Sequence, residues 1–133
     1  MKIHLMSCLL VAGTIFAAAP DVAALAAAMK SIQPAHGALG KKIAAKDASA
    51  AADAKQLVTL FGASAKFAKA KKWEDGMGFN KTAIASYKAI AKAAMAGKWD
   101  DASKAHQDAT GTCKGCHSAH RGPKGADGAF PIK

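Results

Sequence analysis

The spacing of apolar side chains restricts most strongly how this chain can fold. Seven positions of its first long stretch recur at alternating steps of three and four: Val22, Leu25, Met29, Ile32, His36, Leu39 and Ile43. This spacing puts them on one face of an α-helix, as in helix bundles. Alanine, the best helix former, occurs 35 times, and no segment alternates as a strand does. The sequence therefore predicts an all-α fold.

Three further stretches share this helical character. The spacing of small and apolar residues over 46–73 predicts a second helix. One face of it is made of Ala50, Ala54, Leu57, Phe61, Ser64 and Ala68. Residues 74–79 contain two glycines and predict a loop, after which Asn80 can cap a third helix over 81–97. Asp100 can cap a fourth helix that runs to about Arg121. Pro34 lies inside the first stretch, where we expect a kink and not a break.

Four helices with mostly short connections predict an antiparallel up-down-up-down four-helix bundle. The inward faces carry many alanines and few large side chains, so the protein alone fills such an interior thinly. A bulky apolar group bound inside would supply the missing volume.

The first nineteen residues differ from the rest. Lys2 precedes an apolar run, and small residues follow it, which is the layout of a secretory signal peptide. The run is too short to span a bilayer. We therefore expect a signal peptide over 1–19, a helical domain over 20–121, an irregular glycine- and proline-rich tail over 122–133, and a periplasmic, non-membrane-spanning protein.

The chemistry is concentrated at residues 112–121, which read TCKGCHSAHR. On a helix, Cys113, Cys116 and His117 share one face. The C-x-x-C-H spacing is typical of covalent haem attachment: each thiol bonds a haem vinyl group, and the histidine ligates the iron. The sequence therefore predicts one haem c, held by Cys113, Cys116 and His117, and with it a four-helix bundle with covalently bound haem.

Two other uses of these residues fit less well. A thioredoxin-type redox pair belongs near a strand–helix–strand pattern, which this sequence lacks. Zinc could be bound by Cys113, Cys116, His117 and His120, but structural zinc ligands usually come from two separate elements that the metal ties together.

A C-x-x-C-H motif on the last helix of a small bundle resembles the class II c-type cytochromes, which include the cytochrome c′ proteins. Residues 29–43 are similar to the family's first helix, and residues 94–121 to its last turn and helix. The family has an arginine four residues after the histidine, as Arg121 is here. The resemblance implies haem binding in the periplasm and leaves two uses for Arg121: pairing with a haem propionate, or acting as an exposed cation at the helix end.

The second axial position of the iron depends on which residues share an end of the bundle with His117. In an antiparallel bundle Met29 lies there, on the inward stripe of the first helix. Met77, in the expected loop, is at the same end, and Met95 is remote. His36 lies about 10 Å further along the axis than Met29, and His120 leaves the helix that carries His117. Met29 is therefore the predicted distal ligand, and it matches the family position that faces the distal side of haem.

The resemblance implies two possible functions. Six-coordinate members use a methionine here as a ligand and carry single electrons between redox partners. In five-coordinate cytochrome c′ members the residue at this position only blocks the distal side, and nitric oxide or carbon monoxide can bind; a methionine is compatible with both. We favour the electron carrier and expect no enzyme, because no general acid, base or nucleophile constellation is evident.

The formal net charge of +10 comes almost entirely from scattered lysines. It favours redox partner proteins with acidic docking surfaces. Aromatic residues are sparse and not interleaved with the basic ones, so we expect no nucleic-acid partner. The resemblance also implies that two chains can pair through their first two helices as a homodimer.

Overall fold

The computed structural model describes residues 19–133. Apart from Ala19, the expected signal peptide lies outside the described residues. The described chain forms four α-helices and no named strand: α1 (Val22–Ala44), α2 (Ala50–Ala70), α3 (Glu74–Met95) and α4 (Trp99–His120). The predicted all-α fold is therefore confirmed, and none of the four helices is both long and apolar enough to cross a membrane.

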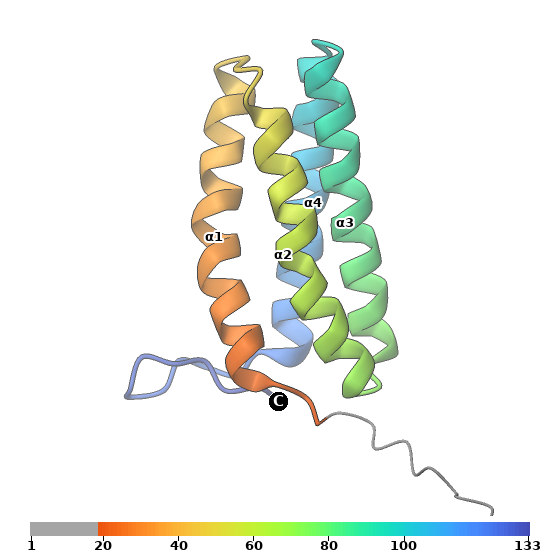
Figure 1. Ribbon diagram of the computed structural model, residues 1–133. Helices are drawn as coiled ribbons and strands as arrows, with labels where there is room; N and C mark the ends of the chain where they lie inside the picture. Colours follow the sequence, from red (N-terminus) through yellow and green to blue (C-terminus); the bar gives the residue numbers. More distant parts are fainter. Residues whose placement is uncertain (1–18) are drawn as a thin grey trace, which may run out of the picture.

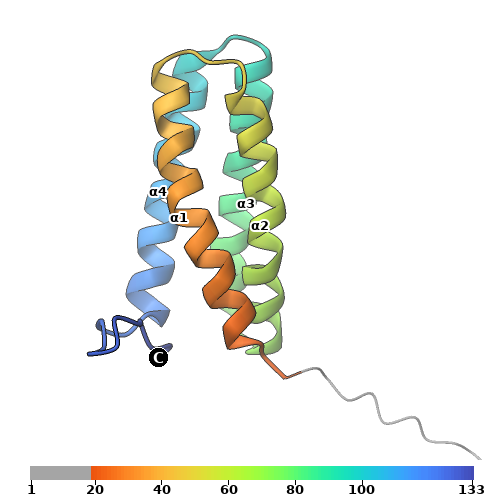
Figure 2. The same cartoon turned by 60° about the vertical axis from the view of Figure 1, so that its left-hand side comes forward.

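The helices stand side by side as an up-down-up-down four-helix bundle (Figure 1). Each helix packs against its sequence neighbours, and α1 also packs against α4. We call "motif end" the end where α1 and α3 begin and α2 and α4 finish; it is the lower end in Figure 1. There α1 leans away from α4 toward α2 (Figure 2), and the α1–α4 contact is the smallest of the four interfaces.

Local sequence explains two of the helix ends. The Asp21 carboxylate caps α1 by accepting a hydrogen bond from the Ala24 amide at 2.9 Å. Gly97 follows α3 with a φ of +68°, a left-handed conformation that glycine adopts without steric cost. α1 continues through Pro34, as predicted.

The start of α3 differs from the sequence-based prediction. Residues 74–79 are helical and not a loop, so Asn80 is a buried residue inside α3 and not its cap. The surroundings of Gly76 explain why position 76 is a glycine although it lies inside a helix. A Cβ at this position would lie 3.0 Å from the Trp73 side chain and 3.3 Å from that of Ala68. The glycine permits close packing of the helices and does not end one.

The largest of the fully buried side chains lie away from the motif end. The largest that are fully buried are Tyr87, Leu39, Leu57 and Ile90. In α4 only three residues are buried, Ala102, Ala105 and Ala109. The predicted inward face of α2 is buried at every position, whereas the stripe of α1 weakens toward its start, where Val22 is 55% exposed.

After α4 the chain turns back on itself. Gly122 donates a backbone hydrogen bond to Pro131, and Lys133 donates one to His120. An isolated bridge pairs Arg121 with Ile132. The tail thus has no helix or strand of its own and is attached to the end of α4.

Candidate functional site

Cys113, Cys116 and His117 lie in the last third of α4, at the motif end, and all three are partly buried. α4 continues for eleven residues beyond Ala109, and none of those residues is buried. The segment that carries the motif is therefore covered less by the other helices than the first half of α4 is.

Cys113 is attached to the main core. It packs against the apolar cluster that all four helices build, which includes Tyr87 of α3. Burial raises the pKa of the Cys113 thiol.

Cys116 and His117 lie in a different electrostatic setting. Burial raises the pKa of the Cys116 thiol, and the charges of Asp75 and Cys113 raise it further. Burial also lowers the pKa of His117, with a second contribution from the Arg121 charge. Both thiols are therefore protonated and His117 is neutral near pH 7, and a neutral imidazole has the free nitrogen lone pair that a metal needs.

The three candidate methionines differ in burial. Met29, in the second turn of α1, is partly buried and packs against the core cluster. Met77 lies on α3, not in a loop, and is 40% exposed; Met95 is 64% exposed at the opposite end. Met29 is thus the only one of these three that combines a position at the motif end with contact to the core.

Arg121 lies just beyond α4, where its amide donates to the His117 carbonyl at 2.9 Å. Its side chain is exposed, and the guanidinium carbon lies 4.1 Å from the centre of the Phe130 ring, a cation–π contact with the tail.

His120, considered above as a zinc ligand, is held away from the motif. Its Nε2 lies 2.9 Å from a carboxylate oxygen of Asp75, and its ring stacks on Trp73 with centroids 3.9 Å apart. No group of three or more His, Cys, Asp and Glu side chains within residues 19–133 is arranged to hold a metal ion. The four side chains of the zinc alternative are therefore not gathered into such a site.

A polar network from three helices was not visible in the sequence. His36 on α1 lies 2.9 Å from the Tyr87 hydroxyl through Nδ1 and 2.9 Å from the Thr110 hydroxyl through Nε2. Its ring stacks on that of His106, with centroids 4.0 Å apart and planes 7° apart. Both ring nitrogens of His36 thus lie at hydrogen-bond distance from groups of other helices.

Two hollows in the described surface lie away from the motif residues. A crevice of about 220 Å³ separates the end of α1 from the start of α4, and a shallow groove of about 760 Å³ runs between α3 and α4. The groove reaches Gly111 and Thr112 but is not lined by Cys113, Cys116 or His117.

The motif residues fit a covalently held haem in their chemistry. Two free thiols and a neutral imidazole lie on neighbouring turns of one helix, in a segment that the other helices cover incompletely. A partly buried thioether lies at the same end, on α1. The chain matches no known protein-family model, no curated protein and no solved structure.

Proposed function

We propose that this protein is a periplasmic c-type cytochrome of the class II kind, with one covalent haem, that carries single electrons between redox partners. The observation that carries the proposal is the C-x-x-C-H set on the incompletely covered end of α4. Proximal ligation is assigned to His117, and the thioethers to Cys113 and Cys116.

The surroundings of the motif support this assignment. A haem is large and apolar, and the segment after Ala109 has only partly buried or exposed side chains. α1, the helix that leans away from this segment in Figure 2, carries Met29. A group bonded to α4 would bury apolar surface on both helices, and burial of apolar surface is the main favourable term in folding.

Each residue has a distinct role in the proposal. The neutral imidazole of His117 and the thioether of Met29 would hold the haem iron, and Arg121 could exchange its contact with Phe130 for a propionate. Haem, when bound, supplies an iron that accepts and donates one electron. A methionine as second ligand raises the reduction potential relative to two histidines.

The test is the absorption spectrum of protein produced with the haem-attachment machinery. We expect covalently retained haem and a low-spin ferric spectrum with the far-red band of methionine–iron ligation. A high-spin spectrum with prompt binding of nitric oxide or carbon monoxide would support the five-coordinate, gas-binding alternative instead. Polypeptide of unmodified mass, with no visible colour, would contradict both.

Two methionine variants separate the candidate distal ligands. Met29→Ala should abolish the methionine–iron band and give a high-spin spectrum, whereas Met77→Ala should leave the spectrum unchanged, because Met77 is 40% exposed and, unlike Met29, is not among the side chains that pack against the core cluster. The reverse result would transfer the ligand role to Met77.

A further inference from the structure

Tyr87 is the only tyrosine in the chain, and it lies in the middle of the core. Its side chain is 0% exposed. The ring of Phe61 packs on it with centroids 5.4 Å apart, and the ring of His36 meets it edge-on with centroids 6.0 Å apart. Its hydroxyl lies 2.9 Å from His36 Nδ1. A phenol is therefore enclosed in the bundle with an imidazole against its hydroxyl group.

The hydrogen bonds around His36 decide the direction of this contact. The Thr110 hydroxyl donates to the His106 carbonyl at 2.9 Å, so its oxygen can only accept a proton from His36 Nε2–H. Nδ1 of the neutral ring then carries a lone pair. Tyr87 therefore donates its proton to Nδ1, and Thr110 fixes the tautomer that makes this possible.

Both partners are uncharged near pH 7. Burial raises the pKa of Tyr87, so the phenol keeps its proton. Burial, followed by the charge of His106, lowers the pKa of His36 to about 4, so Nδ1 stays free to accept. The core thus holds a neutral phenol whose proton points at a neutral base.

This pairing is what the one-electron oxidation of a phenol needs. An electron removed from a phenol alone leaves a radical cation, which is a far stronger acid than an imidazolium and is costly in an apolar interior. With a base in place, the phenolic O–H bond breaks as the electron leaves, and an N–H bond forms at His36 Nδ1. The products are a neutral phenoxyl radical and an imidazolium. When an electron returns, the proton moves back, because a buried imidazolium is unfavourable.

We propose that Tyr87 is a redox site in its own right, which gives one electron to a strong outer-sphere one-electron oxidant while its proton passes to His36. His36 is the proton acceptor, and Thr110 is a positioning residue that sets its tautomer. The inference goes beyond the proposed electron-carrier function and needs no haem, because every group that it uses belongs to the chain.

Burial also protects the oxidised side chain. Two phenoxyl radicals on different molecules cannot meet and couple when the ring of each is 0% exposed. The two tryptophans, Trp73 and Trp99, are partly exposed, so an electron vacancy on either is open to reductants in the solvent. The site in the core is the one that can retain the vacancy.

The experiment uses the full chain with Cys8→Ala, Cys113→Ala and Cys116→Ala, in which no thiol competes and no haem can be bonded. The oxidant is an anionic ruthenium polypyridyl complex, which the net charge of +10 attracts. A light flash with a cobalt(III) ammine as electron acceptor generates its oxidised form. We expect the electron paramagnetic resonance spectrum of a tyrosyl radical, which narrows with ring-deuterated tyrosine, is absent in Tyr87→Phe and forms more slowly in D2O.

Three variants in the same background test the roles of the network. His36→Phe keeps an aromatic ring against His106 but removes the base, so tyrosyl formation should become about a hundredfold slower, the usual contribution of a positioned base. Thr110→Val nearly keeps the side-chain shape but frees the tautomer, so it should also slow the reaction, by a smaller factor. His106→Phe is the matched control: His106 bonds the His36 carbonyl and not the phenol, so this variant should not slow it.

Absence of a tyrosyl signal, a tryptophanyl signal alone, or an equal rate in His36→Phe would overturn the proposal. So would covalent tyrosine-linked dimers of the parent chain, read by mass spectrometry, because they need exposed phenoxyl rings. If His36→Phe loses its helicity, Thr110→Val decides, and a rate equal to that of the parent chain would then overturn the proposal. A wild-type chain that never takes up haem would contradict the proposed function and leave these results intact.

Discussion

At the scale of single residues, the bundle contains more internal polarity than its alanine-rich composition suggests. His36, Tyr87 and Thr110 satisfy one another across three helices, as buried polar groups must. Asn80 is satisfied only in part: its amide nitrogen donates to the Gly76 carbonyl at 2.8 Å, and its buried Oδ1 has no hydrogen-bond partner within the described chain. The two bonds of His36, to Tyr87 and to Thr110, join different helices, so they fix how α1, α3 and α4 align: a shift of one turn would break both.

The His36 network should make stability depend on pH. The folded state lowers the pKa of His36 from 6.5 to about 4, so its contribution is complete above pH 6.5 and is lost as pH falls toward 4. Between pH 7 and pH 4.5 we expect a loss of about 2 kcal/mol in the free energy of unfolding. Urea denaturation at the two pH values measures it.

The matched control for this pH effect is His36→Phe, which removes the titrating ring but keeps an aromatic side chain against His106. Its free energy of unfolding should fall clearly less between the same two pH values. An equal fall in both proteins would assign the effect to other groups.

At the scale of helices, α1 is least covered near its start. Leu25 and Met29, in the part that leans away from α4, are only partly buried, whereas Leu39 and Ile43, near the other end, are buried. Its two glycines also differ in surroundings. A Cβ on Gly37 would meet nothing within 4 Å, but one on Gly40 would lie 2.9 Å from the His106 ring.

Alanine at these two glycines should have opposite effects. Gly37→Ala should stabilise the protein by up to about 1 kcal/mol, because alanine has the higher helix propensity and the site is open. Gly40→Ala should destabilise it, because the His106 ring is held by its stack on His36 and by a 3.0 Å hydrogen bond to the His36 carbonyl. Chemical denaturation measures the change in the free energy of unfolding for both variants. A change in the same direction in both would contradict the packing described for His106.

Helix periodicity was the most reliable sequence signal. It predicted α1, α2 and α4 to within a few residues, and every residue that it placed on the inward face of α2 is buried, although it missed Ala51 and Phe67. It missed the start of α3, because glycines are typical both of loops and of close helix contacts, and only the three-dimensional neighbours of Gly76 distinguish the two. The motif could be placed on α4 from its spacing, but the Tyr87–His36–Thr110 network could not, because its members come from different helices and share no periodicity.

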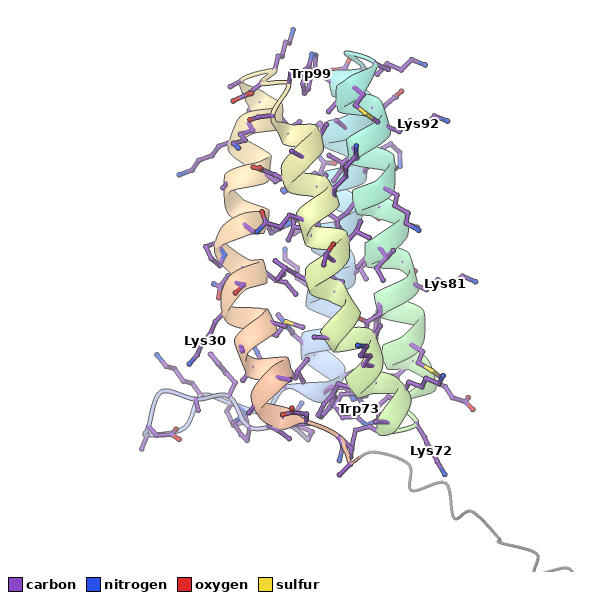
Figure 3. All side chains as sticks on the ribbon, in the orientation of Figure 1. Lys30, Lys72, Trp73, Lys81, Lys92 and Trp99 are labelled. Atoms are coloured by element: carbon purple, nitrogen blue, oxygen red, sulfur yellow. The ribbon has the colours of Figure 1, made fainter. Side chains whose placement is uncertain are left out.

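At the scale of the whole molecule, charge and packing are distributed differently. Lysines extend outward over the bundle: Lys30 and Lys72 near the motif end, Lys81 on α3, and Lys92 toward the far end (Figure 3). The formal net charge is +10. Core packing is uneven, with the largest fully buried side chains in the middle and far parts of the bundle. The positive surface therefore extends over the whole protein, while the incompletely covered segment lies at one end.

The charge predicts how haem-loaded protein should exchange electrons with small probes. Reduced protein should react faster with an anionic oxidant such as ferricyanide at low salt, and added salt should slow this reaction by screening the attraction. A cationic cobalt(III) hexaammine oxidant should show the opposite salt dependence. The same salt dependence for both probes would contradict a role for the positive surface in attracting partners.

Uneven packing predicts where the haem-free bundle opens. Segments with few buried apolar contacts open at low free-energy cost, so amides of residues 113–120 should exchange with deuterium faster than those of residues 102–109. Covalent haem would tie 113–120 to the first half of α1, and both segments should then become more protected. The middle of α2, whose inward face is already buried, is the internal control and should change little. Equal protection along α4 without haem would mean that its last third is stabilised by contacts other than burial, and the case for a large group covering that segment would lose its physical basis.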